Sequence, residues 1–93
     1  MNKYIVTVTD TFGGELNYSW AEYYLVNAKN IKQAATKVSK ETGRKTKKIW
    51  NTGDEVGVYQ VIGSPIAYYI EYIDENEQWV KDKINNLHHV KRI

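Results

Sequence analysis

The side chains most able to do chemistry in this sequence are the charged ones, and they are concentrated in two segments of opposite net charge. Residues 29–48 hold eight basic side chains against one acid, a net charge of +7. Residues 49–79 hold six acids and no Lys or Arg, a net charge of −6. The overall charge of +2 therefore conceals two opposed surfaces, and each could bind a ligand of the other sign.

The basic block indicates contact with phosphates. Lys and Arg clustered at the end of a helix and in the loop beyond it can hold a nucleic-acid backbone, and an aromatic ring just past them can stack on a base. The same cations could instead interact favourably with the negative end of the dipole at the helix C-terminus. The overall net charge of +2 is also small for a dedicated nucleic-acid binder. The candidate nucleic-acid contacts are Lys37, Lys40, Arg44, Lys45, Lys47, Lys48 and Trp50.

The acidic block is interleaved with tyrosines and indicates a protein-binding face. Such a face could imitate a phosphate backbone or dock on a basic partner, and tyrosine adds contact area at little entropic cost. The alternative is structural: acids from Asp74 onward would face the positive end of a helix dipole, and the tyrosines would pack in the core. The candidate protein-binding residues of this block are Asp54, Glu55, Tyr68, Glu71, Asp74, Glu75 and Glu77.

The segment 10–20 offers a second candidate protein-binding feature. Asp10 can hydrogen-bond the amides that follow it, and Gly13-Gly14 tolerates positive φ, so we expect a tight loop. An exposed Phe12 or Trp20 beside this loop would serve as a hot-spot anchor. The alternative is that Phe12 folds back onto the core and the loop is structural.

Catalysis is not expected. His88 and His89 are the only histidines, and adjacent residues on a helix point about 100° apart, so they would not chelate one metal ion. The chain has no cysteine, which excludes disulfides and thiolate metal sites. No nucleophile–base pair or phosphate-binding glycine loop is present. We therefore expect no enzymatic activity, no catalytic residues, no metal and no cofactor.

The elements that must position these residues follow from hydrophobic periodicity and turn residues. We expect one α+β domain over 1–93, in which a single antiparallel sheet carries two helices on one face in the order ββ-α-βββ-α. The clearest element is helix 30–42, with Asn30 as N-cap, Gln33 reaching back to it and Gly43 as its stop. The other expected elements are strands 4–9, 18–26, 47–51, 56–62 and 66–73, a helix following Asp74 and a tail over 88–93.

Composition narrows the setting. The N-terminus has no long apolar region of the kind a signal peptide needs, and no apolar run approaches the roughly 20 residues that span a bilayer. We therefore expect a small soluble cytoplasmic protein without membrane contact. It could be a monomer or a homodimer, since blocks of +7 and −6 could meet across subunits.

The stretch Val6-Thr7-Val8-Thr9-Asp10-Thr11-Phe12-Gly13-Gly14-Glu15-Leu16-Asn17-Tyr18-Ser19-Trp20 resembles the opening of small proteins encoded in phage and prophage accessory regions. The resemblance covers roughly residues 4–43. It implies a non-enzymatic accessory protein, placed in the host cytoplasm, that binds and inhibits or modulates a host protein such as a restriction or CRISPR effector. The resemblance and the acidic block together make this our leading hypothesis. The alternative is a small nucleic-acid-binding regulator that uses residues 29–48.

Overall fold

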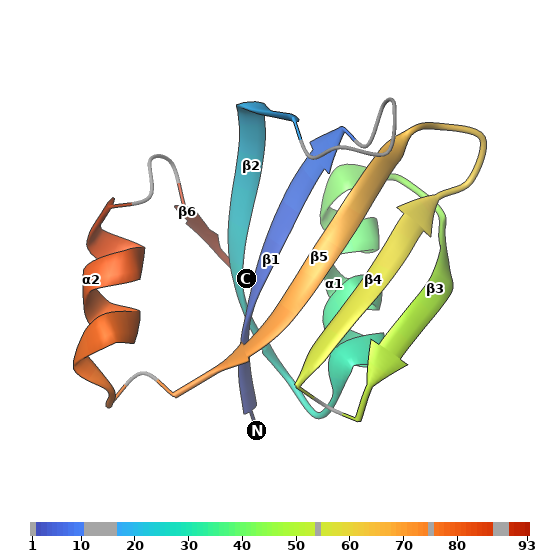
Figure 1. The fold of residues 1–93 in the computed structure, drawn as a ribbon. Helices are drawn as coiled ribbons and strands as arrows, with labels where there is room; N and C mark the ends of the chain where they lie inside the picture. The colour runs from blue at the N-terminus through green and yellow to red at the C-terminus, as the bar shows by residue number, and fades with distance from the viewer. Residues whose placement is uncertain (1, 11–16, 54, 75, 87–89) are drawn as a thin grey trace.

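The computed structural model of the chain describes residues 2–10, 17–53, 55–74, 76–86 and 90–93, and their side chains except those of residues 17–20 and 86. Two helices lie against one sheet, which confirms the α+β class and the predicted element order as far as α2 (Figure 1). The elements are β1 (Asn2–Asp10), β2 (Asn17–Ala28), α1 (Ile31–Thr42), β3 (Thr46–Thr52), β4 (Val56–Val61), β5 (Ile66–Ile73), α2 (Gln78–Asn86) and β6 (Val90–Arg92).

The sheet is mixed. Its six strands lie in the order β3-β4-β5-β1-β2-β6, and every neighbouring pair is antiparallel except β2 with β6, which is parallel. The prediction of a purely antiparallel sheet with a tail over 88–93 is therefore wrong at one edge. β6 forms because the edge of β2 has backbone groups to satisfy: the Ile93 amide donates to Leu25 O at 2.9 Å, and Asn27 donates back to Ile93 O.

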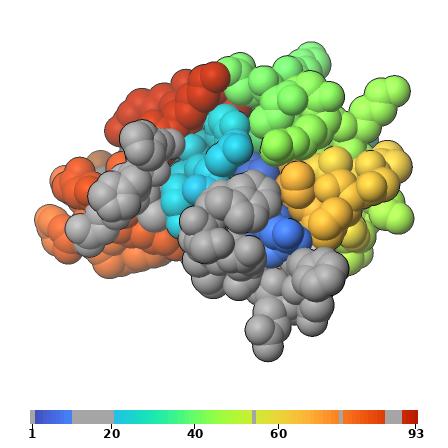
Figure 2. Space-filling model, turned by 90° about the horizontal axis from the view of Figure 1, so that it is seen from above, coloured from blue at the N-terminus to red at the C-terminus, as the bar shows by residue number. Residues whose placement is uncertain are grey.

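The helices cover opposite faces of the sheet, not one face as predicted. Successive strand residues alternate between faces, and Tyr4 and Val6 of β1 belong to the core under α1 whereas Ile5 belongs to the core with Val80 of α2. Seen from above, the red residues of β6 lie beside the green end of α1, where Lys91 forms an ion pair with Glu41 (Figure 2). Two helices are needed because β1 and β2 are apolar on both sides.

Helix α1 forms where the sequence predicts it. The Asn30 side chain accepts from the Gln33 amide at 2.8 Å, and the Gln33 side chain accepts from the Lys29 amide at 2.7 Å. Gly43 adopts φ 73°, and its amide donates to Ser39 O, which ends the helix in a left-handed cap. The apolar stripe on the opposite side holds α1 against the sheet; its buried members are Ile31, Ala34, Ala35 and Val38.

Helix α2 begins at Gln78, later than the acids that were expected to open it. Asp74 forms a turn instead: its carboxylate accepts from the Asn76 amide at 2.9 Å and its carbonyl accepts from the Glu77 amide at 3.1 Å. A short acidic side chain that bonds the backbone two residues on competes with helix formation, which explains the delay.

The core under α1 contains a tyrosine whose acidity is changed by its surroundings. Tyr24 is 7 % exposed, and its hydroxyl donates to the Glu22 carboxylate at 3.0 Å. Burial, followed by that hydrogen bond, raises the pKa of Tyr24 from 10.0 to about 12. The neutral phenol is therefore the form that the fold stabilises.

This pKa shift predicts a loss of stability in alkali. An unfolded tyrosine releases its proton near pH 10, whereas folded Tyr24 holds it until about pH 12. The unfolded state therefore binds fewer protons between these values, and the free energy of unfolding falls as the pH rises, by roughly 2 kcal/mol for this group. Urea unfolding at pH 9 and pH 11.5 should show a smaller fall in Tyr24→Phe than in the parent. An identical fall in both proteins would contradict the assignment.

Candidate functional site

A basic trench runs between α1 and β3, on the face of the sheet that α1 covers. It consists of two adjoining hollows of about 500 and 580 Å³ that share Lys32, Thr46 and Tyr59. One hollow opens at the start of α1, beside Asn30, and the other at its end, beside Gly43. Five cationic side chains line this basic trench: Lys32, Lys40, Arg44, Lys45 and Lys48.

Periodicity of the two elements places these cations in the trench. Lys32, Thr36 and Lys40 are four residues apart on α1, so they form one stripe along the helix. Thr46 and Lys48 alternate with Lys47 on β3, so they share the strand face that looks toward α1. The Ser39 and Thr46 hydroxyls lie 3.1 Å apart and tie helix to strand.

The trench has one sign of charge. Among the described residues, none that lines the trench is Asp or Glu, and the acid of α1, Glu41, pairs with Lys91 of β6 outside it. A concave surface lined by like charges focuses the electrostatic potential and raises the local concentration of counter-ions. The N-terminal end of α1 adds its positive dipole at one end of the trench. The arrangement is therefore suited to a ligand with several negative charges.

Arg44 adds an unsatisfied donor to this surface. It follows the Gly43 cap, its amide donates to Ser39 O at 3.1 Å, and its Nη1 is buried with no hydrogen-bond partner among the described residues. A buried cationic donor left unpaired costs about 1–3 kcal/mol or more.

Three of the residues predicted to contact nucleic acid lie outside the trench. The Lys37 ammonium donates to Asn27 O of β2. Lys47 pairs with Gln60 and Trp50 with Val58, so both lie on the opposite face of the sheet from Lys48. Residues two apart normally share a strand face, but the register shift between Lys48 and Trp50 inserts one extra residue and so places Trp50 on the opposite face from Lys48.

Lys32 was missing from the predicted contacts, although its spacing from Lys40 along one helix face could have identified it. The predicted set therefore contains the right cations mixed with others from the same stretch of sequence.

Acids and exposed aromatics meet at the end of the sheet where β5 leads into α2. We define the acidic rim as Glu55, Glu71, Tyr72, Asp74, Glu77 and Trp79. Tyr72 is 42 % exposed and Trp79 is 51 % exposed. The Glu77 carboxylate accepts from the indole of Trp79, and Glu71 forms an ion pair with Lys83 at 3.1 Å. The rim thus presents the Trp79 ring beside a carboxylate.

Tyr68 does not belong to this surface. It is 0 % exposed, and its hydroxyl lies 2.8 Å from the Thr42 hydroxyl at the end of α1. The prediction that it contacts a partner is wrong, because strand alternation turns it into the core under α1 whereas Tyr72 protrudes at the strand end. The interpretation of the tyrosines as core residues holds for Tyr68.

Several predicted residues cannot be placed. Phe12, Asp54, Glu75, His88 and His89 lie outside the described residues, as does the side chain of Trp20. The hypothesis that the segment 10–20 carries a hot-spot anchor stays a prediction.

Within the described residues, no three His, Asp or Glu side chains gather where they could hold a metal ion. Neither α1 nor α2, the two helices of the described part of the chain, combines the length and apolar character needed to cross a membrane. Comparison of the chain with protein-family models, with curated proteins and with solved structures found no match.

Proposed function

We propose that this chain is a non-enzymatic binding module that holds single-stranded nucleic acid in the basic trench. The observation that carries the proposal is the convergence of five cations on one concave surface, with no acid among the described residues that line it. α1 has 12 residues, which gives the trench a length of about 18 Å. The five cations along that length could neutralise up to about five phosphates of a strand that follows the trench.

The shape of the trench favours a single strand over a duplex. Helix α1 lies flat against the sheet through its buried stripe and is not offered as a projecting element for a major groove. Tyr59 is the only aromatic residue among the described residues of the lining and is 8 % exposed, so stacking on bases contributes little. Recognition therefore rests on the phosphate backbone and tolerates many sequences.

Fluorescence anisotropy with a labelled oligonucleotide of about ten nucleotides tests this function. We expect binding at 50 mM salt that weakens roughly 130-fold at 200 mM, because about five neutralised phosphates give a slope near −3.5 in log K against log salt. A duplex of the same sequence should bind more weakly. Absence of binding at 50 mM salt, or binding that does not respond to salt, would contradict the proposal.

A second function is favoured by the acidic rim. The exposed rings of Tyr72 and Trp79, the latter beside the Glu77 carboxylate, have the composition of a protein-binding hot spot. We propose on this basis that the rim docks on a basic protein surface, which would suit a phage-type accessory protein acting on a nucleic-acid-handling host protein, as an inhibitor of a CRISPR effector would.

Affinity capture from bacterial lysate, followed by mass spectrometry, tests the rim. The variant Asp74→Lys/Glu77→Lys should lose the captured protein. The variant Glu22→Lys/Glu41→Lys makes the same charge change away from the rim and should keep it. Equal capture by both variants would exclude docking through the rim.

A further inference from the structure

We infer that Trp50 is a stacking platform for a base of the nucleic-acid strand that the basic trench holds, and that the strand reaches it by crossing the edge strand β3. The inference rests on the proposed trench function and adds to it a contact on the opposite face of the sheet. Trp50 pairs with Val58 of β4, faces away from the trench and is 48 % exposed. A large exposed indole beside a surface suited to phosphates is the combination that single-strand binding proteins use.

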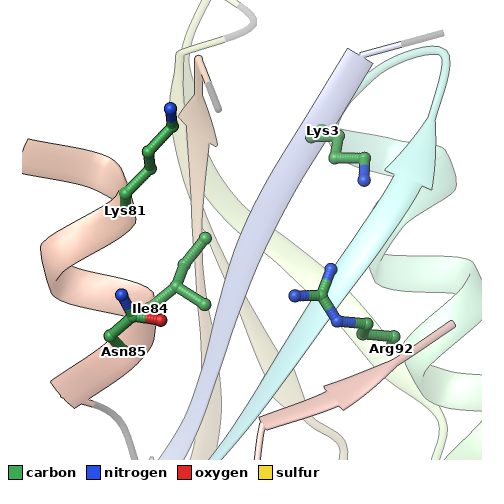
Figure 3. A pocket seen from close by; sticks show the side chains of 5 residues that line it. All are labelled: Lys3, Lys81, Ile84, Asn85 and Arg92. Atoms are coloured by element: carbon green, nitrogen blue, oxygen red, sulfur yellow. The ribbon is translucent and has the colours of Figure 1, made fainter. Parts of the chain in front are cut away.

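The sheet face that carries Trp50 is only partly covered. α2 packs over β1 and β2 through a core cluster that includes Ile5 and Leu25. Figure 3 shows this covered part, where Ile84 points from α2 across the gap to the strands that carry Lys3 and Arg92. Neither α1 nor α2 stands over β3 and β4 on this side, as the view in Figure 1 shows. The indole therefore lies on a part of the sheet that both helices leave open.

The neighbours of Trp50 on the sheet support its ring from one side. Trp50 lies opposite Val58, and Val58 lies opposite Tyr69 of β5, so the three side chains form a row across the face. Directly opposite residues have Cβ atoms about 4.5–5.5 Å apart, and Val58 is only 7 % exposed although neither helix covers it. The indole thus has apolar neighbours on the sheet side and can offer its outer side to a base.

The path from the trench to Trp50 is short. Lys48 and Asn51, close to Trp50 on either side in the sequence, both line the trench, and β3 is the outermost strand of the sheet. Neighbouring strands lie about 4.7–4.9 Å apart, so crossing β3 takes about the width of one strand. Lys47 lies next to Trp50 on the same face, because their partners on β4 are two residues apart. Cations therefore accompany the path on both faces of β3.

The charges near Trp50 favour a nucleic-acid strand as the ligand and set its direction of approach. Lys47 and Lys48 belong to the end of the platform that the strand would cross. An acid, Glu71, lies further along the same face opposite Val56 and pairs with Lys83. The strand should therefore arrive from the lysine end. Stacking adds affinity without selecting a sequence, because every base has a π face.

Two labelled oligonucleotides of about ten nucleotides test the contact by anisotropy. One carries thymine at every position, and the other has the same backbone with abasic sites throughout. The parent should bind the first roughly tenfold or more tightly than the second, as expected for one stacked base. Trp50→Ala should lose this difference and keep the parent's affinity for the abasic backbone. Trp79→Ala removes an indole of similar exposure, 51 %, from α2 and should keep the difference.

Intrinsic fluorescence gives a second readout. The thymine oligonucleotide should quench the parent, whereas Trp50→Phe should lose most of the quenching and retain most of the affinity, because a ring remains for stacking. Quenching that persists in Trp50→Phe would overturn the assignment.

The remaining outcomes separate this contact from the trench. If Trp50→Ala still prefers the thymine oligonucleotide as the parent does, stacking is overturned while the trench function stands, and a protein becomes the better ligand for this face. If Trp50→Ala weakens both oligonucleotides equally, Trp50 acts through the fold and stacking is likewise overturned. If neither oligonucleotide binds the parent, the proposed function fails and this contact fails with it.

Discussion

The variant Lys32→Gln/Lys40→Gln/Lys48→Gln is expected to bind single-stranded nucleic acid roughly 100-fold more weakly than the parent at 50 mM salt. The three lysines line the trench from both walls, so their removal takes away the cations that would face successive phosphates. Each lost phosphate contact should also reduce the slope of log K against log salt by about 0.7, or about 2 in total. Anisotropy titrations at four salt concentrations measure both quantities.

The chain supplies a matched control for this experiment. Lys29, Lys37 and Lys47 belong to the same basic stretch of sequence but none of them lines the trench. Their triple replacement by glutamine removes the same charge and should lower the affinity only a few-fold through the general field. Equal losses in the two triple variants would show that net charge, and not the trench, holds the ligand.

Gly57→Ala is expected to destabilise the protein by about 1–3 kcal/mol, through steric overlap between β4 and α1. A Cβ atom at Gly57 would lie 2.8 Å from Cγ2 of Ile31 and 3.3 Å from Cβ of Asn51. Ile31 is 2 % exposed and opens α1, so its branched side chain cannot move aside without displacing the first turn of the helix. Urea denaturation measures the change in the free energy of unfolding.

A double-mutant cycle identifies the overlap as the cause. Ile31→Ala alone should cost about 2–5 kcal/mol by leaving a cavity. In Gly57→Ala/Ile31→Ala the new methyl group fills part of that cavity, so the double variant should be more stable than the sum of the single effects by about 1 kcal/mol or more. Strict additivity would show that Gly57→Ala acts through the backbone of β4 instead.

Most of the helices and strands could be predicted from the sequence, because the residues that determine where they begin and end are local. Asn30, Gln33 and Gly43 each act on a backbone group within a few residues, so the ends of α1 could be read without knowledge of the sheet. The placement of α2 on the other face could not, since it depends on which side of β1 and β2 the first helix leaves uncovered. β6 depends likewise on an edge of β2 that exists only once the sheet has formed.

The candidate sites were harder to predict, because a charged stretch of sequence does not equal a charged surface. The basic stretch divides among the trench, the Lys37 contact with β2 and the opposite sheet face that carries Lys47. Tyr68 and Tyr72 lie on the same face of β5, where they pair with Val8 and Tyr4 of β1, yet only Tyr68 is buried, because Tyr72 lies at the strand end.

The irregularity of β3 has a further consequence for how copies of this protein meet. β3 is an edge strand, and an edge with free backbone groups invites another sheet to extend it. The register shift after Lys48 bends that edge, and the exposed lysines along it would face their own counterparts in a second copy. At the other edge, β6 has only three residues and carries Lys91 and Arg92. Both edges of the sheet thus disfavour edge-to-edge pairing of copies into fibres, which leaves the trench open at high protein concentration.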